Sequence, residues 1–134
     1  MERRVKSYRD LVVWQKAMDM AVAVYRVSDM FPDRERFGLT IQVRKSGVSV
    51  PSNIAEGQAR ASTREFLHHL SIARGSLAET ETHLLVALRV EYITKAHLRE
   101  AWDLIQDVGK LLNRLMQSLE RGEKPGLGSS STSR

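Results

Sequence analysis

The sequence predicts an all-α protein: an antiparallel up-and-down four-helix bundle whose second helix is kinked by a proline. Three observations lead to this prediction. Apolar residues recur at three- and four-residue steps in four long segments, the breaks between the segments are short, and no stretch alternates as a β-strand does. We expect helices at about residues 10–29, 35–58, 63–90 and 95–120, within one bundle domain of residues 1–121.

The first predicted helix, residues 10–29, carries two neighbouring apolar lines. The first line is Leu11, Trp14, Met18, Ala21, Tyr25 and Ser28, and the second is Val13, Ala17, Met20, Val24 and Val27. One apolar face per helix is enough for a monomeric bundle, so the surplus favours self-association. Pro32 ends the segment, because proline disfavours helical geometry at the residue before it.

The second predicted helix, residues 35–58, is the least regular segment. Its expected apolar stripe is Phe37, Ile41, Val48 and Ile54. Pro51 removes a backbone donor and should clash with the carbonyl of Gly47, so we expect a kink there.

The third and fourth predicted helices begin at recognisable caps. Ser62 and Glu65 have capping-box spacing, and Thr94 is a cap residue. The third stripe is Phe66, Leu70, Ala73, Leu77, Leu84 and Leu88. The fourth, the most regular, is Ala101, Leu104, Ile105, Val108, Leu111, Leu112, Leu115 and Leu119. Residues 122–134, rich in Gly and Ser, are expected to be disordered.

The second and third helices should form a hairpin that turns near residues 60–61. Residues equidistant from that turn should face each other, which places Arg74 beside Gly47. The same register predicts a close crossing of Gly47 with Gly75 and an ion pair between Arg44 and Glu79. We therefore assign structural roles to Gly47, Pro51, Asn53, Glu56, Gly57, Gly75 and Glu79.

The chain has an excess of positive charge. It holds 21 Lys and Arg against 16 Asp and Glu, a formal net charge of +5 in 134 residues. Such an excess suits a polyanionic partner, RNA or DNA. The candidate nucleic-acid-binding residues are Arg44, Lys45, Arg60, Arg64 and Arg74. The alternative is that these side chains form the ion pairs of a tightly packed hairpin, because a guanidinium suits carboxylates and phosphates equally.

No spacing in the chain assembles a catalytic or metal site. Glu65 and His68 have the Glu-x-x-His spacing of di-iron bundles, but the required second copy is absent. The serines of residues 46–52 and Ser76 cluster loosely, without an evident histidine and carboxylate in support. We therefore expect a protein that is not an enzyme and has no cofactor or metal.

The chain shows no feature of a membrane or secreted protein. No apolar run approaches the roughly 20 residues that cross a bilayer, and the basic first residues precede no signal-type apolar core. There is no cysteine, which excludes disulfides and thiolate chemistry. We expect a cytoplasmic protein without a membrane partner.

Four strings in the sequence carry a family resemblance. They are YRDLVVWQKAMDMAVAVY at residues 8–25, FP at 31–32, FGLTIQVRKSGVSVPSNIAEGQAR at 37–60 and EFLHHLSIARGSLAETETHL at 65–84. With these strings, and above all SVPSNIAEG followed by ARGSL, the chain resembles the bacterial 23S rRNA intervening-sequence proteins. That family is related to the accessory variability determinant of diversity-generating retroelements. The resemblance covers about residues 8–120.

The resemblance implies a four-helix bundle that assembles into a ring, typically a homopentamer. Family members are encoded within insertions in large-subunit rRNA genes or beside reverse transcriptases. For the retroelement relatives, the family implies binding to nucleic acid and to the reverse transcriptase. The implied role is thus a non-catalytic nucleic-acid-binding or scaffold protein. The alternative is a purely protein–protein assembly or adaptor module.

Two positions depart from the family's usual pattern. After Arg44 the family usually has an arginine and two alanines, and this chain has Lys45-Ser46-Gly47. Where leucine is usual, this chain has Thr80, which should lose some apolar packing. The basic character survives the first change, while the glycine should loosen the second helix.

Overall fold

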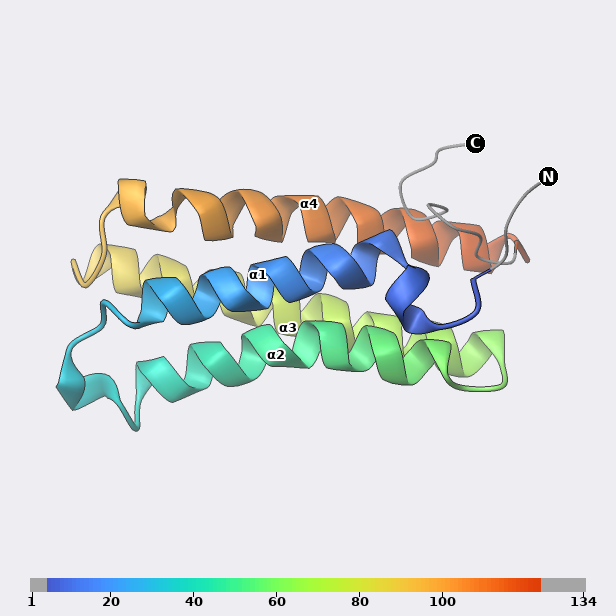
Figure 1. Ribbon diagram of the computed structural model, residues 1–134, viewed down its shortest axis with the longest axis horizontal. Coiled ribbons are helices and arrows are strands. Elements are labelled where there is room, and N and C mark those ends of the chain that lie inside the picture. The colour runs from blue at the N-terminus through green and yellow to red at the C-terminus, as the bar shows by residue number, and fades with distance from the viewer. Residues whose placement is uncertain (1–4, 124–134) are drawn as a thin grey trace.

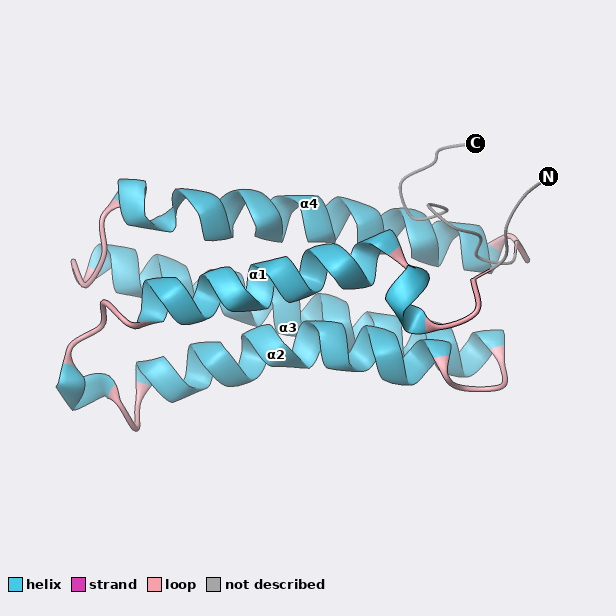
Figure 2. Cartoon of the chain, viewed as in Figure 1, coloured by secondary structure: helices cyan, strands magenta, loops and turns pink. Residues whose placement is uncertain are grey.

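The computed structural model describes residues 5–123, and within them four α-helices and no strand (Figures 1 and 2). The helices are α1 (Val12–Ser28), α2 (Leu39–Gln58), α3 (Thr63–Arg89) and α4 (Lys95–Glu120). Successive helices run in opposite directions, so α1 begins and α4 ends at the same end of the bundle (Figure 1). The predicted all-α up-and-down bundle is confirmed. Helix α2 continues through Pro51 as one helix. The kink at Pro51 and the assembly of copies into a ring stay predictions.

The four helices are arranged so that each has two neighbours. Helices α1 and α3 both contact α2 and α4, and the most extensive contact is between α2 and α3. The α2–α3 hairpin therefore sets the positions of most of the residues singled out in the sequence.

Helices α3 and α4 begin at residues whose side chains cap them. The Ser62 hydroxyl accepts the N–H of Glu65 at 3.1 Å, which begins α3. At α4 the Thr94 hydroxyl accepts the N–H of His97, and the His97 ring accepts the N–H of Thr94, each at 3.2 Å. These reciprocal bonds satisfy backbone donors that a helix start leaves without partners.

The second helix begins later than the sequence predicts. Asp33–Glu35 form a separate 3₁₀ turn, and Gly38 lies outside the helical region at φ −113° and ψ −114°. A similar turn, Tyr8–Asp10, precedes α1, which begins at Val12. From residue 124 on, the predicted tail lies outside the described residues.

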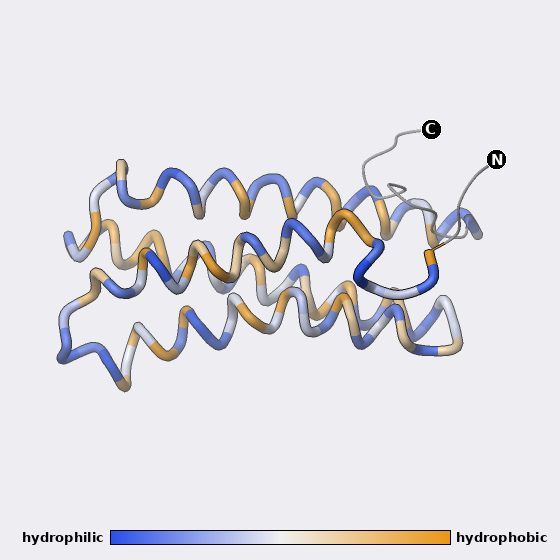
Figure 3. The backbone as a smooth tube through the Cα atoms, viewed as in Figure 1, coloured by the Kyte–Doolittle hydropathy of each residue, from blue (hydrophilic) through white to orange (hydrophobic). Residues whose placement is uncertain are grey.

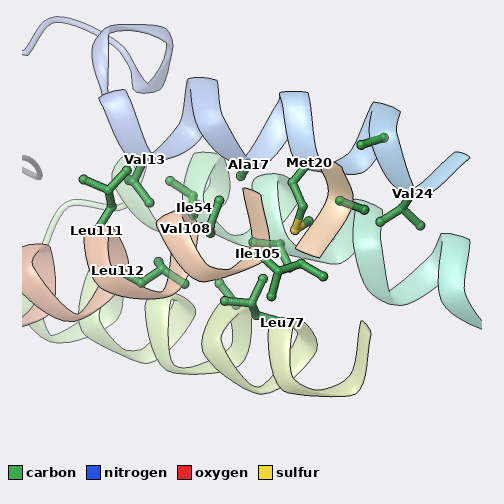
Figure 4. Close-up of a cluster of buried hydrophobic side chains, with 14 of the residues drawn as sticks. Val13, Ala17, Met20, Val24, Ile54, Leu77, Ile105, Val108, Leu111 and Leu112 are labelled. Atoms are coloured by element: carbon green, nitrogen blue, oxygen red, sulfur yellow. The ribbon is translucent and has the colours of Figure 1, made fainter. Parts of the chain in front are cut away.

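The core lies along the axis between the four helices. Figure 3 shows apolar and hydrophilic residues in alternating bands along each helix, as amphipathic helices require. In Figure 4 side chains from all four helices point toward one another: Val13, Ala17, Met20 and Val24 of α1, Ile54 of α2, Leu77 of α3, and Ile105, Val108, Leu111 and Leu112 of α4.

The two apolar lines of α1 differ in burial. The second line is buried in the core, while Met18 and Tyr25 of the first line are exposed and Trp14 is half-buried. The prediction that this helix has more apolar surface than its own bundle uses is therefore confirmed.

The predicted apolar stripe of α2 is wrong at three of its four positions. Phe37, Ile41 and Val48 are exposed, and only Ile54 is buried. The buried line instead follows smaller residues at the same helical spacing: Val43, Gly47, Val50, Ile54 and Gly57.

Candidate nucleic-acid interface

The register of the α2–α3 hairpin differs from the predicted one. Ser46 faces Thr80 and Ser49 faces Ser76, with both pairs of hydroxyl oxygens 2.8 Å apart. At these two pairs the α2 residue meets a residue five or four positions further along α3 than expected, while nearer the turn Asn53 and His69 pair within one position of the expected register. The α3 residues that face α2 are thus Ser76 and Thr80. Gly75 and Glu79 each lie one position before a facing residue and are therefore turned about 100° away from it.

Two predictions that depended on the register are wrong. Gly75 is exposed and has nothing within 4 Å of where its Cβ would lie, so it makes no crossing with Gly47. Gly47 instead approaches Val24 of α1, at 3.4 Å from the corresponding Cβ position. Arg44 pairs with Asp29 and not with Glu79, which is exposed on α3.

A seam of polar side chains runs between α2 and α3. Besides the two hydroxyl pairs, the Asn53 side-chain oxygen lies 3.2 Å from Nδ1 of His69, and its amide donates to the Ser49 carbonyl at 2.9 Å. Thr80 is fully buried and Ser46 nearly so. Each seam member has a polar partner, as buried polar groups require.

The two departures from the family pattern meet in this polar seam. Ser46, where the family usually has alanine, is hydrogen-bonded to Thr80, where it usually has leucine. Thr80 also bonds the carbonyl of Ser76 at 2.8 Å. The lost apolar packing expected of Thr80 is thus offset by a buried hydrogen bond.

A histidine lies beside Ser46, but the pair lacks the features of a catalytic site. The Ser46 hydroxyl is 3.4 Å from Nδ1 of His83, yet it also bonds the Val43 carbonyl at 3.1 Å. Ser46 is only 5% exposed. Among the described residues no carboxylate is hydrogen-bonded to His83 to orient its ring, the role a third residue plays in a catalytic triad.

The close approach in the hairpin occurs at Gly57 near the turn. A Cβ on Gly57 would lie 2.7 Å from Cβ of His69 and 3.0 Å from the Phe66 ring. Beside it, Glu56 forms an ion pair with Arg60 at 2.9 Å. The structural roles expected of Glu56 and Gly57 therefore belong to the turn end of the hairpin.

Arg44 and Lys45 lie in a groove between the end of α1 and the start of α2, which we call the basic groove. Its volume is about 600 Å³, and its lining residues are Tyr25, Arg36, Phe37, Thr40, Ile41, Arg44, Lys45, Val48, Ser49 and Ser52. Three of these side chains are cationic and none is a carboxylate. Such a groove attracts phosphate groups.

Arg44 is held in place by α1. Its guanidinium donates to the Ser28 hydroxyl and to the Asp29 carboxylate, each at 2.8 Å, and lies 4.7 Å from the centre of the Tyr25 ring. Lys45 and Arg36 are exposed and form no ion pair within the described part of the chain. The two free cations are thus Lys45, which the sequence suggested, and Arg36, which it did not.

The turn that carries Arg36 and Phe37 is anchored by Glu35. One Glu35 carboxylate oxygen accepts the N–H of Leu39 at 2.9 Å, and the other accepts the O–H of Tyr92 at 2.6 Å. The donated Tyr92 O–H, together with the Leu39 N–H and the charge of Arg34, lowers the pKa of Glu35. The same hydrogen bond raises the pKa of Tyr92.

The other candidate cations lie elsewhere. Arg60 and Arg64 line a separate surface pocket at the α2–α3 turn, and Arg74 donates to the Asn113 side chain of α4 at 3.3 Å. Sixteen residues of helix separate Arg44 from Arg60, about 24 Å at the usual rise. The five candidates therefore occupy three places, and only Arg44 and Lys45 share a groove.

An apolar groove adjoins the basic one along α1 and α2. Its volume is about 430 Å³, and it is lined by Tyr8, Trp14, Met18, Ala21, Val22, Tyr25, Val48, Pro51, Ser52 and Ala55. No lining residue is charged. Exposed apolar surface of this kind is typical of protein–protein contacts.

The described residues form neither a metal site nor a membrane span. Residues 5–123 contain no group of three or more His, Asp or Glu placed to hold a metal, and Glu65 and His68 belong to no such group. No helix in this range combines the length and apolarity of a membrane span.

The family model of the 23S rRNA-intervening sequence protein matches residues 9–114, which include α1, α2 and α3 whole and most of α4. The chain belongs to this family. Its bundle is similar to the 1.70 Å crystal structure of a protein of unknown function from the S23 ribosomal protein family of Bacteroides thetaiotaomicron. The two share 28% identity and a TM-score of 0.73 over 79% of this chain and 99% of that one. No curated protein matches the chain significantly.

Proposed function

We propose that this family member is a non-catalytic, oligomeric helical-bundle protein that binds nucleic acid, in a binding or scaffold role linked to rRNA intervening sequences or retroelements. The basic groove is the observation that carries the proposal. Arg36, Arg44 and Lys45 line it without a carboxylate, and two of them have no ion-pair partner among the described residues. Binding should consist mainly of phosphate contacts, which release counterions and weaken steeply with salt.

Fluorescence anisotropy with a labelled RNA of about 12 nucleotides tests this proposal, since single-strand sites span roughly 4–16 nucleotides. The test variant is Arg36→Gln with Lys45→Gln, which spares Arg44 and its contacts to α1. The matched control is Lys95→Gln with Arg99→Gln, the same charge loss in a groove between α3 and α4. The slope of log affinity against log salt should become less negative by about 0.7 for each phosphate contact removed.

The expected result is a shallower slope for the Arg36/Lys45 variant and an unchanged slope for the control. Equal loss in both variants would mean that binding is diffuse and does not use the basic groove. No binding by the wild type at about 50 mM salt would leave the second candidate, a purely protein–protein assembly or adaptor module. An adjacent reverse-transcriptase gene would then favour that enzyme as partner.

The oligomeric part of the proposal rests on the apolar groove. Met18, Val22 and Tyr25 of α1 expose 40–45% of their surface there and are not part of the core. We propose that copies meet on this face, with a pentamer as the expected assembly. In light scattering, the wild type should then have about five times the chain mass of 15.2 kDa.

A matched pair of valines tests the oligomer contact. Val22→Glu places a charge in the apolar groove and should dissociate the assembly, because burying an unpaired charge is strongly unfavourable. Val86→Glu makes the same change on α3 at nearly the same exposure, 43% against 45%. If the mass falls for both variants or for neither, the contact does not lie in the apolar groove.

A cytoplasmic location also belongs to this proposal, supported by the absence of cysteine.

A further inference from the structure

Phe37 is the large apolar side chain that the fold leaves most open to solvent. It is 83% exposed, while the other exposed large apolar residues of the described chain lie between 38% and 51%. It packs against no part of the core. An aromatic side chain contributes most when its area is buried, so the ring adds little to the stability of the isolated chain.

The backbone beneath Phe37 is nevertheless firmly held. The flanking Glu35 carboxylate bonds both Leu39 of α2 and Tyr92 beyond α3, and the N–H of Gly38 bonds the Glu35 carbonyl at 2.9 Å. The ring is thus presented from a fixed turn between two helical elements. A fixed backbone beneath an aromatic ring limits the conformational freedom that is lost on contact, since a phenylalanine side chain has only two χ angles.

The surroundings of Phe37 are cationic. The Arg36 guanidinium lies 5.6 Å from the centre of the Phe37 ring, and Arg44 and Lys45 line the same groove. Hydroxyl groups of Thr40, Ser49 and Ser52 complete its polar lining. An apolar protein segment would suit this groove poorly, because covering three cations without a carboxylate costs desolvation energy.

We propose that the basic groove binds single-stranded nucleic acid, with one unpaired base stacked on Phe37 and the adjoining phosphates on Arg36 and Lys45. Every base has a flat face that stacks on an aromatic ring, and phosphates follow it along a basic groove. A duplex cannot use Phe37 in this way, because its bases are already stacked and paired. This inference rests on the proposed nucleic-acid function and names the ligand class and the stacking residue.

The test is Phe37→Ala, with Phe37→Trp as the conservative variant and Ile72→Ala as a matched control. Ile72 is an exposed apolar residue of α3 that does not line the basic groove. Affinities are measured by anisotropy for a labelled single-stranded RNA of about 12 nucleotides and for a duplex RNA. We expect Phe37→Ala to weaken single-strand binding between about 5-fold and 150-fold, with an unchanged salt slope, because no phosphate contact is lost.

Duplex binding should be the same in wild type and Phe37→Ala, while Phe37→Trp should keep single-strand affinity and Ile72→Ala should behave as wild type. Equal single-strand affinity in Phe37→Ala and wild type would overturn the inference while the proposed function stands. Equal losses for single strand and duplex, or a changed oligomer mass, would also overturn it. If the wild type binds neither RNA at about 50 mM salt, the proposed function itself fails.

Discussion

Gly57 and Gly75 of the α2–α3 hairpin should respond in opposite ways to the same substitution. Gly57 is buried, and a Cβ there would lie 2.7 Å from Cβ of His69 and 3.2 Å from the Phe66 carbonyl oxygen. These atoms belong to or adjoin the α3 backbone and cannot rotate away. Gly75, inside α3, has no atom within 4 Å of its Cβ position.

The magnitudes follow from two terms. Replacing a helical glycine by alanine stabilises the helix by about 0.5–1 kcal/mol, and both positions are helical. Gly57→Ala must in addition push α2 and α3 apart, and overpacking of this kind costs about 1–3 kcal/mol. Gly75→Ala should therefore be stabilising and Gly57→Ala destabilising, with the overpacking term as the difference between them.

Urea unfolding followed by circular dichroism measures both free energies of unfolding. Protein concentration must be matched, because assembly would add to apparent stability. We expect the midpoint to rise for Gly75→Ala and to fall for Gly57→Ala, with the slope m unchanged in both. A Gly57→Ala protein as stable as Gly75→Ala would refute the close approach of the two helices at this turn.

Three further substitutions probe the packing. Thr80→Val should destabilise the protein by about 1–3 kcal/mol. The loss should be smaller when Ser46 is already replaced by alanine. A double-mutant cycle of the free energies of unfolding that shows no coupling between Ser46 and Thr80 would contradict their buried hydrogen bond. Leu77→Ala should cost about 2–5 kcal/mol, since Leu77 is 6% exposed, and a thermal melt like the wild type's would argue against that burial. Because the pKa of Glu35 is lowered in the fold, its stabilisation is present above about pH 4.3 and lost as the pH falls through the lowered value. Tyr92→Phe should reduce this loss of stability at acid pH. If unfolding curves at neutral and acid pH show the same loss in the wild type and in Tyr92→Phe, the hydrogen bond from Tyr92 to Glu35 is unimportant.

The sequence was a good guide to features that depend on local chemistry. The caps at Ser62 and Thr94 form because a hydroxyl at such a position reaches the N–H three residues ahead. The stripe of α4 is clear because large apolar residues occupy most of its buried face. Both signals lie within a few residues of chain and need no knowledge of the partner helix.

Features that depend on how two helices meet were much harder to predict. The register between α2 and α3 depends on the geometry of a short turn. The prediction placed Gly75 and Glu79 against α2, whereas the structure turns both away from it. Phe37 looked like a core residue because its spacing suited a helix that in fact begins at Leu39. The basic groove joins residues of α1, α2 and the turn before α2, so only the fold brings them together.

The most direct test of the proposed function is the salt dependence of single-stranded RNA binding by the wild type and the two double charge variants. We expect linear plots of log affinity against log salt, a shallower one for Arg36→Gln with Lys45→Gln, and no change for Lys95→Gln with Arg99→Gln. Undetectable binding at about 50 mM salt, or the same change in both variants, would contradict a nucleic-acid site in the basic groove.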